Sequence, residues 1–269
     1  MRPFKKVKNI HFVGIGGAGM IGIARVLLQK GYNISGSDIS DSNDLQRLKK
    51  DGAQVYIGHS NKNIKGAYLL VVSSAIDKNN PELIQAKKDS ITAIPRAEML
   101  GSLMIGYESI AVAGSHGKTT TTSIIAKIMS VANLSPTYVV GGKILSTDEN
   151  SDLGEGKYIV VEADESDGSF LALPAVVGIV TNVEPDHLNH WETFDALENA
   201  FDDFGRQIAA AGGFVVICAD DPGARAMGER LVAEGIDVRS YGESDDATVR
   251  MIDPIQDICL LYTSDAADE

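Results

Sequence analysis

A short glycine-rich segment at residues 110–122 constrains the fold of this chain more than any other feature. An apolar, β-type run at residues 110–113 leads into a Gly-Ser-His-Gly-Lys-Thr-Thr turn, and a helix-like segment follows. Glycines let backbone N–H groups close around phosphate oxygens, and the new helix directs its positive end at them. In such a loop Lys118 can reach the β- and γ-phosphates, and Thr119 can bind Mg²⁺. The segment therefore predicts a site for a nucleoside triphosphate.

This loop is two residues shorter than the general phosphate-loop pattern, because the pattern has glycine where this chain has Val112. A plain turn that caps a threonine-rich helix would also contain glycines. The order of strand, turn, Gly-Lys-Thr and helix favours the phosphate loop. The residues expected around the phosphates are Gly114, Ser115, His116, Gly117, Lys118, Thr119 and Thr120.

Strand-like and helix-like segments alternate along the chain, which favours an α/β fold with parallel sheets and helices on both faces. The predicted strands cover residues 9–13, 33–37, 69–73, 109–113, 158–162, 176–181 and 213–218. The predicted helices cover residues 19–30, 42–51, 80–88, 119–132, 194–210 and 222–234. The alternation falls into two series of strands and helices, and a glycine-rich turn follows the first strand of each, at Gly14 and at Gly114. We therefore expect two α/β domains, with a boundary within residues 95–107 and a helical connector at residues 94–101.

The first glycine-rich turn, Gly14 to Gly19, has the pattern G-x-G-x-x-G between a strand and a helix, and Asp38 lies about 20 residues further on. Alone, this pattern indicates NAD. The same turn can hold any pyrophosphate at a helix N-terminus, or can serve only to pack a strand against a helix. About a hundred residues precede the second turn, too few for both halves of a full dinucleotide fold. A nucleoside diphosphate attached to another group fits this length better.

Polar residues follow two later predicted strands, where α/β folds place their ligands. Glu162 comes first after a buried run and is our candidate for a second Mg²⁺ ligand beside the phosphate loop, although Asp164 or Glu165 could serve instead. The next strand leads to a cluster at residues 182–190. There His187 lies beside Asp186, which favours a metal or phosphate role. Asn182 and His190 are weaker candidates for substrate contacts.

Composition excludes several other classes of function. The chain has 269 residues and a formal net charge of -13, so it would repel nucleic acid. Two cysteines without metal spacing fit a reducing cytoplasm. The sequence shows no secretory signal and no run long enough to insert into a membrane. We therefore expect a cytoplasmic protein that acts on small molecules.

Five segments together resemble the Mur ligases of bacterial cell-wall synthesis: residues 13–20, 95–100, 114–121, 162–170 and 181–188. They occur in the family's order and spacing, and the resemblance covers roughly residues 8–250. The short phosphate loop is the form that this family uses. The resemblance implies a Rossmann-like UDP-substrate-binding domain at residues 1–107 and an incomplete P-loop ATPase-type central α/β domain at residues 108–257. Residues 258–269 do not match the family, and we expect them to be a non-native tail.

The reaction implied by the resemblance is an ATP-dependent amide synthesis. The lactyl carboxylate of UDP-N-acetylmuramate takes the γ-phosphoryl group of ATP, and the amine of L-alanine attacks the resulting acyl phosphate. The family's UDP-substrate residues correspond to Gly14, Ile15, Gly16, Gly17, Ala18, Gly19, Met20, Asp38, Ser73 and Ser74. Its catalytic residues correspond to Lys118, Glu162 and His187. Thr119 and Glu162 would hold the Mg²⁺ of ATP, and His187 would help to hold a second cation.

Three departures from the family pattern qualify this prediction. Several sister ligases carry a carbamylated lysine where this chain has Phe201. The family's adenine-contacting segment and its C-terminal domain are both missing, so we expect this fragment alone to be inactive. Alternatives are a ligase that recycles murein tripeptide, whose first turn differs at Gly17 and Ala18, a nucleotide-binding module without catalysis, and a dinucleotide oxidoreductase. The choice among alanine, serine and glycine, and the oligomeric state, stay open.

Overall fold

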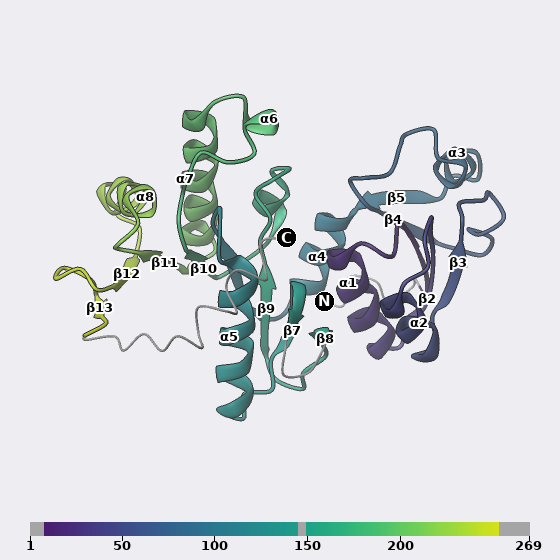
Figure 1. Ribbon diagram of the computed structural model, residues 1–269, viewed down its shortest axis with the longest axis horizontal. Coiled ribbons are helices and arrows are strands. Elements are labelled where there is room, and N and C mark those ends of the chain that lie inside the picture. Colours follow the sequence, from purple (N-terminus) through teal and green to yellow (C-terminus); the bar gives the residue numbers. More distant parts are fainter. Residues whose placement is uncertain (1–7, 145–148, 253–269) are drawn as a thin grey trace. The chain divides into compact units, whose positions relative to one another are not determined.

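The computed structural model describes residues 8–144 and 149–252, which form two compact units. The first unit contains the described residues up to Gly106 together with Thr137–Glu155 (Figure 1). The second unit contains Tyr107–Pro136 and the described residues from Gly156 onward. The predicted tail at residues 258–269 lies outside the described residues.

The first unit is built on a sheet of five parallel strands in the order β3–β2–β1–β4–β5. The strands are β1 (Asn9–Val13), β2 (Asn33–Asp38), β3 (Gln54–Ile57), β4 (Leu69–Val72) and β5 (Thr92–Pro95). The helices are α1 (Ala18–Gln29), α2 (Asn43–Lys50), α3 (Pro81–Lys88) and α4 (Arg96–Met104). The chain proceeds from β1 to β2 and β3 on one side, then returns to β4 and β5 on the other. This reversal opens a crevice at the carboxyl ends of β1 and β4, where such sheets bind ligands.

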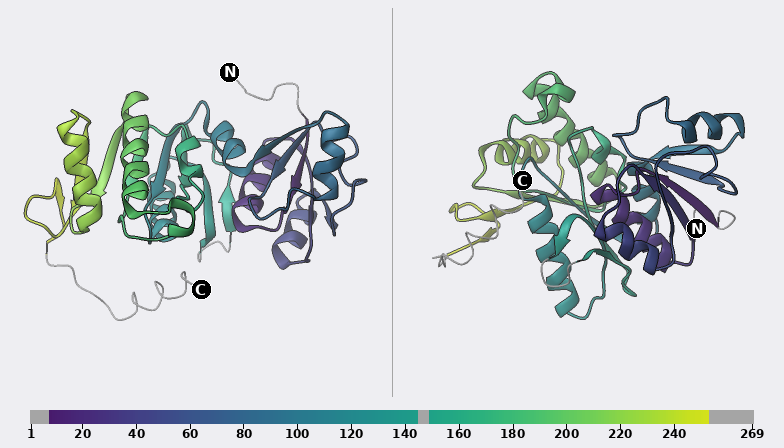
Figure 2. Two further views of the ribbon diagram at one scale, coloured as in Figure 1. Left: turned by 90° about the horizontal axis from the view of Figure 1, so that it is seen from above. Right: turned by 45° about the vertical axis from the view of Figure 1, so that its right-hand side comes forward.

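The second unit repeats this plan with six strands in the order β13–β12–β11–β10–β6–β9. They are β6 (Glu108–Ala113), β9 (Tyr158–Glu162), β10 (Val177–Val180), β11 (Phe214–Cys218), β12 (Val238–Gly242) and β13 (Val249–Arg250). The helices are α5 (Lys118–Val131), the short α6 (Leu188–Trp191), α7 (Phe194–Ala210) and α8 (Pro222–Ala233), with a 3-10 turn at Ser169–Ala172. Helix α5 lies on one side of this sheet, and α7 and α8 lie on the other (Figure 2). The prediction of an α/β fold with parallel sheets is confirmed for both units.

Helix α5 has four threonines in succession directly after its first residue, Lys118, although β-branched residues are weak helix formers. Two side-chain hydrogen bonds show how the helix accommodates this run. The hydroxyl of Thr122 donates to the carbonyl of Lys118 at 2.7 Å, and Ser123 donates to the carbonyl of Thr119 at 2.7 Å. Thr119 differs, because its hydroxyl bonds to a neighbouring strand end and not to the helix backbone. The helix therefore presents the Thr119 hydroxyl to the site described below.

The structure differs from the sequence-based expectation at a hairpin formed by β7 (Thr137–Ile144) and β8 (Glu149–Asp152), which are antiparallel. We expected no strand there, because two glycines interrupt the β-type run of β7. The hairpin groups with the first unit, although residues 137–155 fall within the range expected for the central domain. Gln29 at the end of α1 donates to Asp152 of β8 at 3.1 Å. Residues 94–101, expected to be helical throughout, begin with the last two residues of β5.

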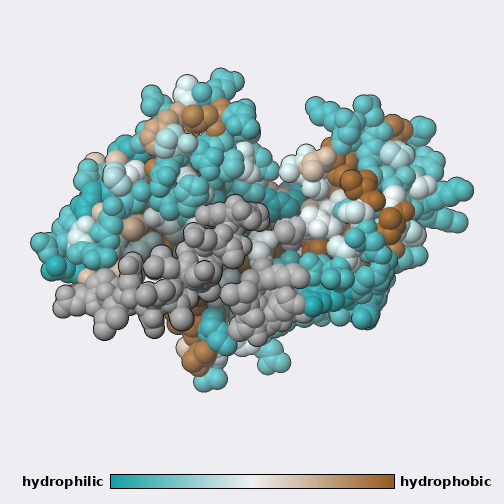
Figure 3. Space-filling view, viewed as in Figure 1, coloured by the Kyte–Doolittle hydropathy of each residue, from teal (hydrophilic) through white to brown (hydrophobic). Residues whose placement is uncertain are grey.

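The surface is predominantly hydrophilic in the view of Figure 3, and the hydrophobic areas among it are small. Scattered exposed hydrophobic residues are normal for a folded protein. Among the described residues, no helix has the length and apolar character needed to cross a membrane.

The buried carboxylate of Glu82 connects β1, β2 and the loop that follows β3 in the first unit. Its Oε2 accepts a hydrogen bond from Ser37 at 2.6 Å, and its Oε1 accepts one from the Asn63 amide at 2.7 Å. The ring nitrogens His11 Nε2 and His59 Nδ1 each lie 3.5 Å from Oε2. Burial alone would raise the pKa of Glu82, but its interactions with His11, Ser37 and Asn63 outweigh burial and hold the pKa at about 2.

This network predicts a loss of stability in acid. Because the pKa of Glu82 in the folded chain lies below the ordinary value of 4.5, its contribution is complete above about pH 5 and is lost as the pH falls toward 2. The full loss is about 3 kcal/mol of unfolding free energy, of which about 2 kcal/mol is already lost at pH 3. Urea unfolding at pH 6 and pH 3, followed by circular dichroism, measures it. Glu82→Gln should reduce this pH dependence, whereas Glu98→Gln, which alters an exposed carboxylate of α4, should not; equal slopes for both variants would contradict the assignment.

Candidate nucleotide and substrate sites

The turn after β6 has a backbone that only glycine accommodates easily. Gly114 has φ +133°, and a Cβ at this position would collide with the hydroxyl of Thr181. Gly117 has φ +79° and precedes the first residue of α5. Both conformations lie in the region that side chains disfavour. The backbone conformation therefore explains why glycine occupies both positions of the predicted phosphate loop. The loop ends at a helix N-terminus, as expected.

Residues after β10 hold this loop in place. The amide of His116 donates to Asn182 Oδ1 at 2.7 Å, and Thr181 Oγ1 donates to the carbonyl of His116 at 2.6 Å. The hydroxyl of Ser115 accepts from the amide of Glu184 at 2.9 Å. In this structure the side chain of Asn182, proposed from sequence as a substrate contact, is engaged with the loop itself. Strands β6 and β10 are neighbours where the chain reverses direction across the sheet, so the loop lies at the switch point of this unit.

The ammonium group of Lys118 makes three contacts. It donates to the carbonyl of Gly114 at 2.6 Å, to the carbonyl of Ser115 at 3.2 Å and to Glu165 Oε1 at 2.9 Å. Glu165 is fully buried, and its Oε2 has no hydrogen-bond partner in the part of the chain that the structure describes. Burial raises the pKa of Glu165, and the charge of Lys118 opposes this rise. From the sequence, Glu165 was only an alternative to Glu162.

Thr119 and Glu162 meet directly at the carboxyl end of β9. The hydroxyl oxygen of Thr119 lies 3.1 Å from each carboxylate oxygen of Glu162. A hydroxyl and a carboxylate on adjacent elements, beside a phosphate loop, form the protein's usual share of a magnesium site whose other ligands are phosphates and water. This donor set fits Mg²⁺. The described residues contain no group of three or more acidic, histidine or cysteine side chains that would bind a metal without such help.

His187 approaches the same carboxylate oxygen of Glu165 that Lys118 contacts. Its Nε2 is 3.7 Å from Glu165 Oε1 and 3.6 Å from Asp186 Oδ2. The residue has φ 51°, an uncommon conformation for a non-glycine residue, and it begins α6. The structure thus places His187 within reach of the Lys118–Glu165 pair.

The sequence candidate His190 and the neighbouring Trp191 have packing roles at α6. The exposed ring of His190 lies 4.8 Å from the ring of Trp191 and contacts the region of Gly168. The indole of Trp191 donates to the carbonyl of Glu165 at 3.0 Å, which fixes the loop after β9. Phe201 is fully buried, with its ring 5.3 Å from that of Phe170, so this position belongs to the core.

A cavity of about 450 Å³ occupies the crevice of the first unit. Four predicted substrate residues line it: Gly14, Gly17, Asp38 and Ser73. Sequence analysis missed the remaining lining residues, which are Ile39, His59, Ala75, Ile76, Asp77, Asn79 and Asn80. They follow β2, β3 and β4, so only the fold brings them to the glycine turn. The other predicted substrate residues do not line this cavity. Ile15 and Met20 are buried in the core, Gly16 donates a backbone hydrogen bond to Asp38, and Gly19 and Ser74 lie outside the lining. The side chain of Ala18 is not among those that the structure describes.

Asp38 closes the glycine turn from the end of β2. Its Oδ2 accepts from the amide of Gly16 at 2.7 Å, and a Cβ on Gly16 would come within 2.7 Å of the same oxygen. Asp38 therefore shapes the turn itself. A Cβ on the adjacent Gly17 would meet nothing closer than 3.6 Å.

These two glycines offer a matched pair of variants. Gly16→Ala should break the Asp38 bond and lower the unfolding free energy by about 1–3 kcal/mol. Gly17→Ala should change it by no more than about 0.5 kcal/mol. Thermal unfolding of both variants beside the parent chain measures the difference. Equal losses of unfolding free energy in the two variants would show that the contact between Asp38 and Gly16 does not limit which residue can stand at Gly16.

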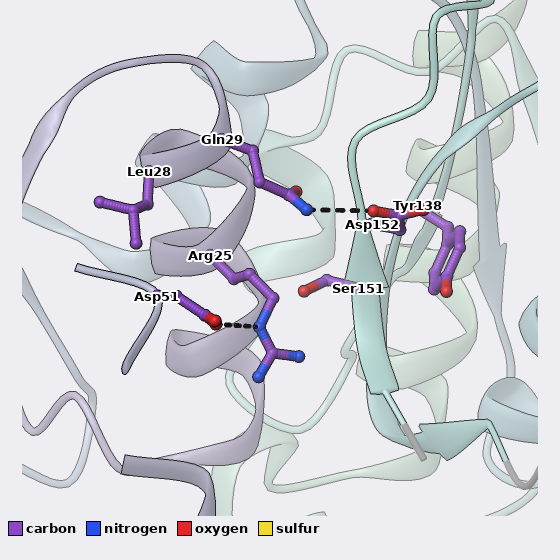
Figure 4. A pocket seen from close by; sticks show the side chains of 7 residues that line it. All are labelled: Arg25, Leu28, Gln29, Asp51, Tyr138, Ser151 and Asp152. Carbon is purple, nitrogen blue, oxygen red and sulfur yellow. Dashed lines mark hydrogen bonds and ion pairs between the residues drawn. The ribbon is translucent and has the colours of Figure 1, made fainter. Parts of the chain in front are cut away.

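A second cavity in the first unit, of about 490 Å³, lies at the other end of α1 from the glycine turn (Figure 4). It is lined by Arg25, Leu28, Gln29, Asp51, Tyr138, Ser151 and Asp152. Arg25 Nε lies 3.5 Å from Asp51 Oδ2. None of the predicted site residues lines this cavity.

Two glycine-rich turns of the phosphate-binding type thus lie at the switch points of two α/β units, an arrangement that is typical of nucleotide-binding proteins. The family model for the Mur ligase catalytic domain matches residues 9–108, and that for the Mur ligase middle domain matches residues 112–257. The chain belongs to the Mur ligase family.

Individual relatives are consistent with this assignment. The chain is 47% identical over 253 residues to UDP-N-acetylmuramate–L-alanine ligase of Rhodopseudomonas palustris strain TIE-1, covering 94% of this chain and 54% of that one. It is 48% identical over 245 residues to the same-named ligase of Xanthobacter autotrophicus, covering 91% and 52%. The chain therefore spans about half the length of the curated relatives it matches.

Solved structures share the fold. The crystal structure of UDP-N-acetylmuramate-alanine ligase from Thermotoga maritima matches with a TM-score of 0.77 and 29% identity, covering 87% of this chain and 52% of that one. A ligase from Neisseria meningitides, described as acting on UDP-N-acetylmuramate and an L-alanyl-γ-D-glutamyl-meso-diaminopimelate peptide, gives a TM-score of 0.81 at 22% identity, covering 90% and 79%. At that identity the second match shows the fold alone.

Proposed function

We propose that this chain is the UDP-sugar-binding and ATP-binding part of an ATP-dependent ligase that joins L-alanine to the lactyl carboxylate of UDP-N-acetylmuramate. The relatives that are 47–48% identical carry this activity in their names. Because the chain spans about half of their length, the amino-acid substrate and the complete reaction are part of the proposal. The reaction belongs to peptidoglycan precursor synthesis, and its soluble nucleotide substrates place it in the cytoplasm.

The chemistry explains why these side chains are needed. A carboxylate is a poor acylating agent, and its approach to a triphosphate brings two anions together. Phosphorylation makes it an acyl phosphate, which the amine attacks with loss of phosphate. Lys118 would neutralise charge on the phosphates, and Thr119 and Glu162 would hold the Mg²⁺. That cation would supply further neutralisation of the phosphate charge.

One observation carries the proposal more than any other. Lys118 and the Thr119–Glu162 pair converge at the carboxyl ends of β6 and β9, at the switch point of the second unit. A packing turn without a ligand would give no reason for a hydroxyl, a lysine and two carboxylates to meet there. The main alternative is the tripeptide-recycling ligase, which uses the same sugar and the same chemistry.

Calorimetric titration with UDP-N-acetylmuramate tests the substrate, with UDP-N-acetylglucosamine and NAD as comparison ligands. We expect saturable binding of UDP-N-acetylmuramate and none of NAD. Binding of NAD alone would overturn the proposal in favour of an oxidoreductase. A folded chain that binds none of the three would also contradict it.

A further inference from the structure

The Lys118 ammonium has no donor to spare for a phosphate. An ammonium has three N–H donors, and here two are directed to the carbonyls of Gly114 and Ser115 and the third to Glu165 Oε1. A phosphate oxygen can therefore bind Lys118 only by replacing or sharing one of these acceptors. The carbonyls belong to a turn fixed by its glycines and by the residues after β10. The Glu165 side chain is the acceptor that can give way by rotation.

Glu165 cannot simply turn toward water. The side chain is fully buried, and its backbone carbonyl is held by the Trp191 indole at 3.0 Å and by the amide of Gly168 at 3.1 Å. Its Oε2 already lacks a hydrogen-bond partner among the described residues. A buried carboxylate that loses its only cation is costly unless another positive group replaces it.

A replacement partner is available on the same side of the site. His187 Nε2 lies 3.7 Å from Glu165 Oε1, and a neutral imidazole beside a carboxylate forms part of a divalent cation site. We propose that Glu165 is the counter-ion of Lys118 in the nucleotide-free chain and becomes, with His187, a ligand of the second cation when phosphate takes Lys118. This inference rests on the proposed function, because it requires a nucleotide at the loop.

The exchange predicts opposite effects of one substitution under two conditions. Without a divalent cation, Glu165 competes with phosphate for Lys118 and places a negative charge beside it, so Glu165→Gln should bind nucleotide more tightly. With a divalent cation, Glu165 supports the second ion, so the same variant should lose that ion. A residue that only positions Lys118 would weaken nucleotide binding under both conditions.

The test is calorimetric titration of a non-hydrolysable ATP analogue into the chain, in EDTA and in Mn²⁺, with bound Mn²⁺ counted by electron paramagnetic resonance. For Glu165→Gln we expect about tenfold tighter binding than the parent chain in EDTA and one fewer Mn²⁺ at saturation. His187→Ala should lose the same Mn²⁺ without any gain in EDTA. Asp167→Asn, on the same loop but facing the amide of Ser169, is the matched control and should resemble the parent chain.

Three results would overturn the inference: weaker binding by Glu165→Gln in EDTA, unchanged binding in EDTA, or retention of every Mn²⁺ by both Glu165→Gln and His187→Ala. Each of these leaves the proposed function intact, because the parent chain still binds nucleotide. Failure of the folded parent chain to bind the analogue with Mn²⁺ would contradict the proposed function itself. Thermal unfolding of each variant verifies that it is folded.

Discussion

Replacing Lys118 by alanine is expected to weaken binding of a magnesium–ATP analogue to this chain by about 100-fold or more. The substitution removes the only positive side chain that contacts the turn after β6 in the described structure. Hydrogen bonds to charged groups are worth up to about 3 kcal/mol, which corresponds to roughly 100-fold in affinity. In the complete ligase reaction the same change should abolish formation of the acyl phosphate.

The specificity of that loss is as informative as its size. Binding of UDP-N-acetylmuramate should stay within about twofold of the parent chain, because the cavity that we assign to this substrate lies in the first unit. Lys127→Ala, which removes an exposed lysine from the same helix, is the matched control and should leave both ligands unaffected. Calorimetry measures both affinities. Retained nucleotide binding by Lys118→Ala, or loss of UDP-sugar binding, would contradict the assignment of the two sites.

Replacing Glu162 by glutamine is expected to remove most of the magnesium dependence of nucleotide binding. Both of its carboxylate oxygens lie 3.1 Å from the hydroxyl of Thr119, and the amide would lose the charge that attracts the cation. We expect the advantage of Mg²⁺ over EDTA to fall by about 10- to 100-fold. Affinity in EDTA should not rise as it does for Glu165→Gln, since the Lys118 ammonium donates its side-chain hydrogen bond to Glu165.

The measurement is the ratio of the analogue's dissociation constants in EDTA and in Mg²⁺, determined by calorimetry for each variant. Glu229→Gln removes an exposed carboxylate of α8 in the same unit and is the control for a change in overall charge. A ratio for Glu162→Gln equal to that of the parent chain would show that Glu162 does not hold the cation.

Sequence predicted the central strands and the phosphate turn because their signals are local. Buried runs such as Ile159–Val161 end in polar residues, and glycine follows β1 and β6 where the turn requires it. The hairpin of β7 and β8 was missed because two glycines interrupt the β-type run of β7, and its contact with α1 joins segments more than a hundred residues apart. No local pattern encodes such a pairing.

The candidate site likewise combines residues that local patterns predicted with residues that only the fold brings together. Thr119 and Glu162 were predicted as partners, and the structure brings them together. Which carboxylate of the run after β9 meets Lys118 depends on how the loop turns at Gly168, with φ 72°, and on its bond to Trp191. From the sequence, Asp164 and Glu165 were only alternatives to Glu162 as a Mg²⁺ ligand, and no carboxylate partner of Lys118 was predicted. No sequence motif singles out His59, because its place in the cavity depends on β2 and β3 lying side by side.

The central claim is that the two glycine turns bind two different nucleotides, and hydrogen–deuterium exchange with mass spectrometry tests it most directly. We expect UDP-N-acetylmuramate to protect the amides around residues 14–20 and 73–80, and a magnesium–ATP analogue to protect those around residues 114–120. Neither ligand should protect the other segment by direct contact. Protection of the first turn by the ATP analogue or by NAD, with no effect of the UDP-sugar, would contradict the claim.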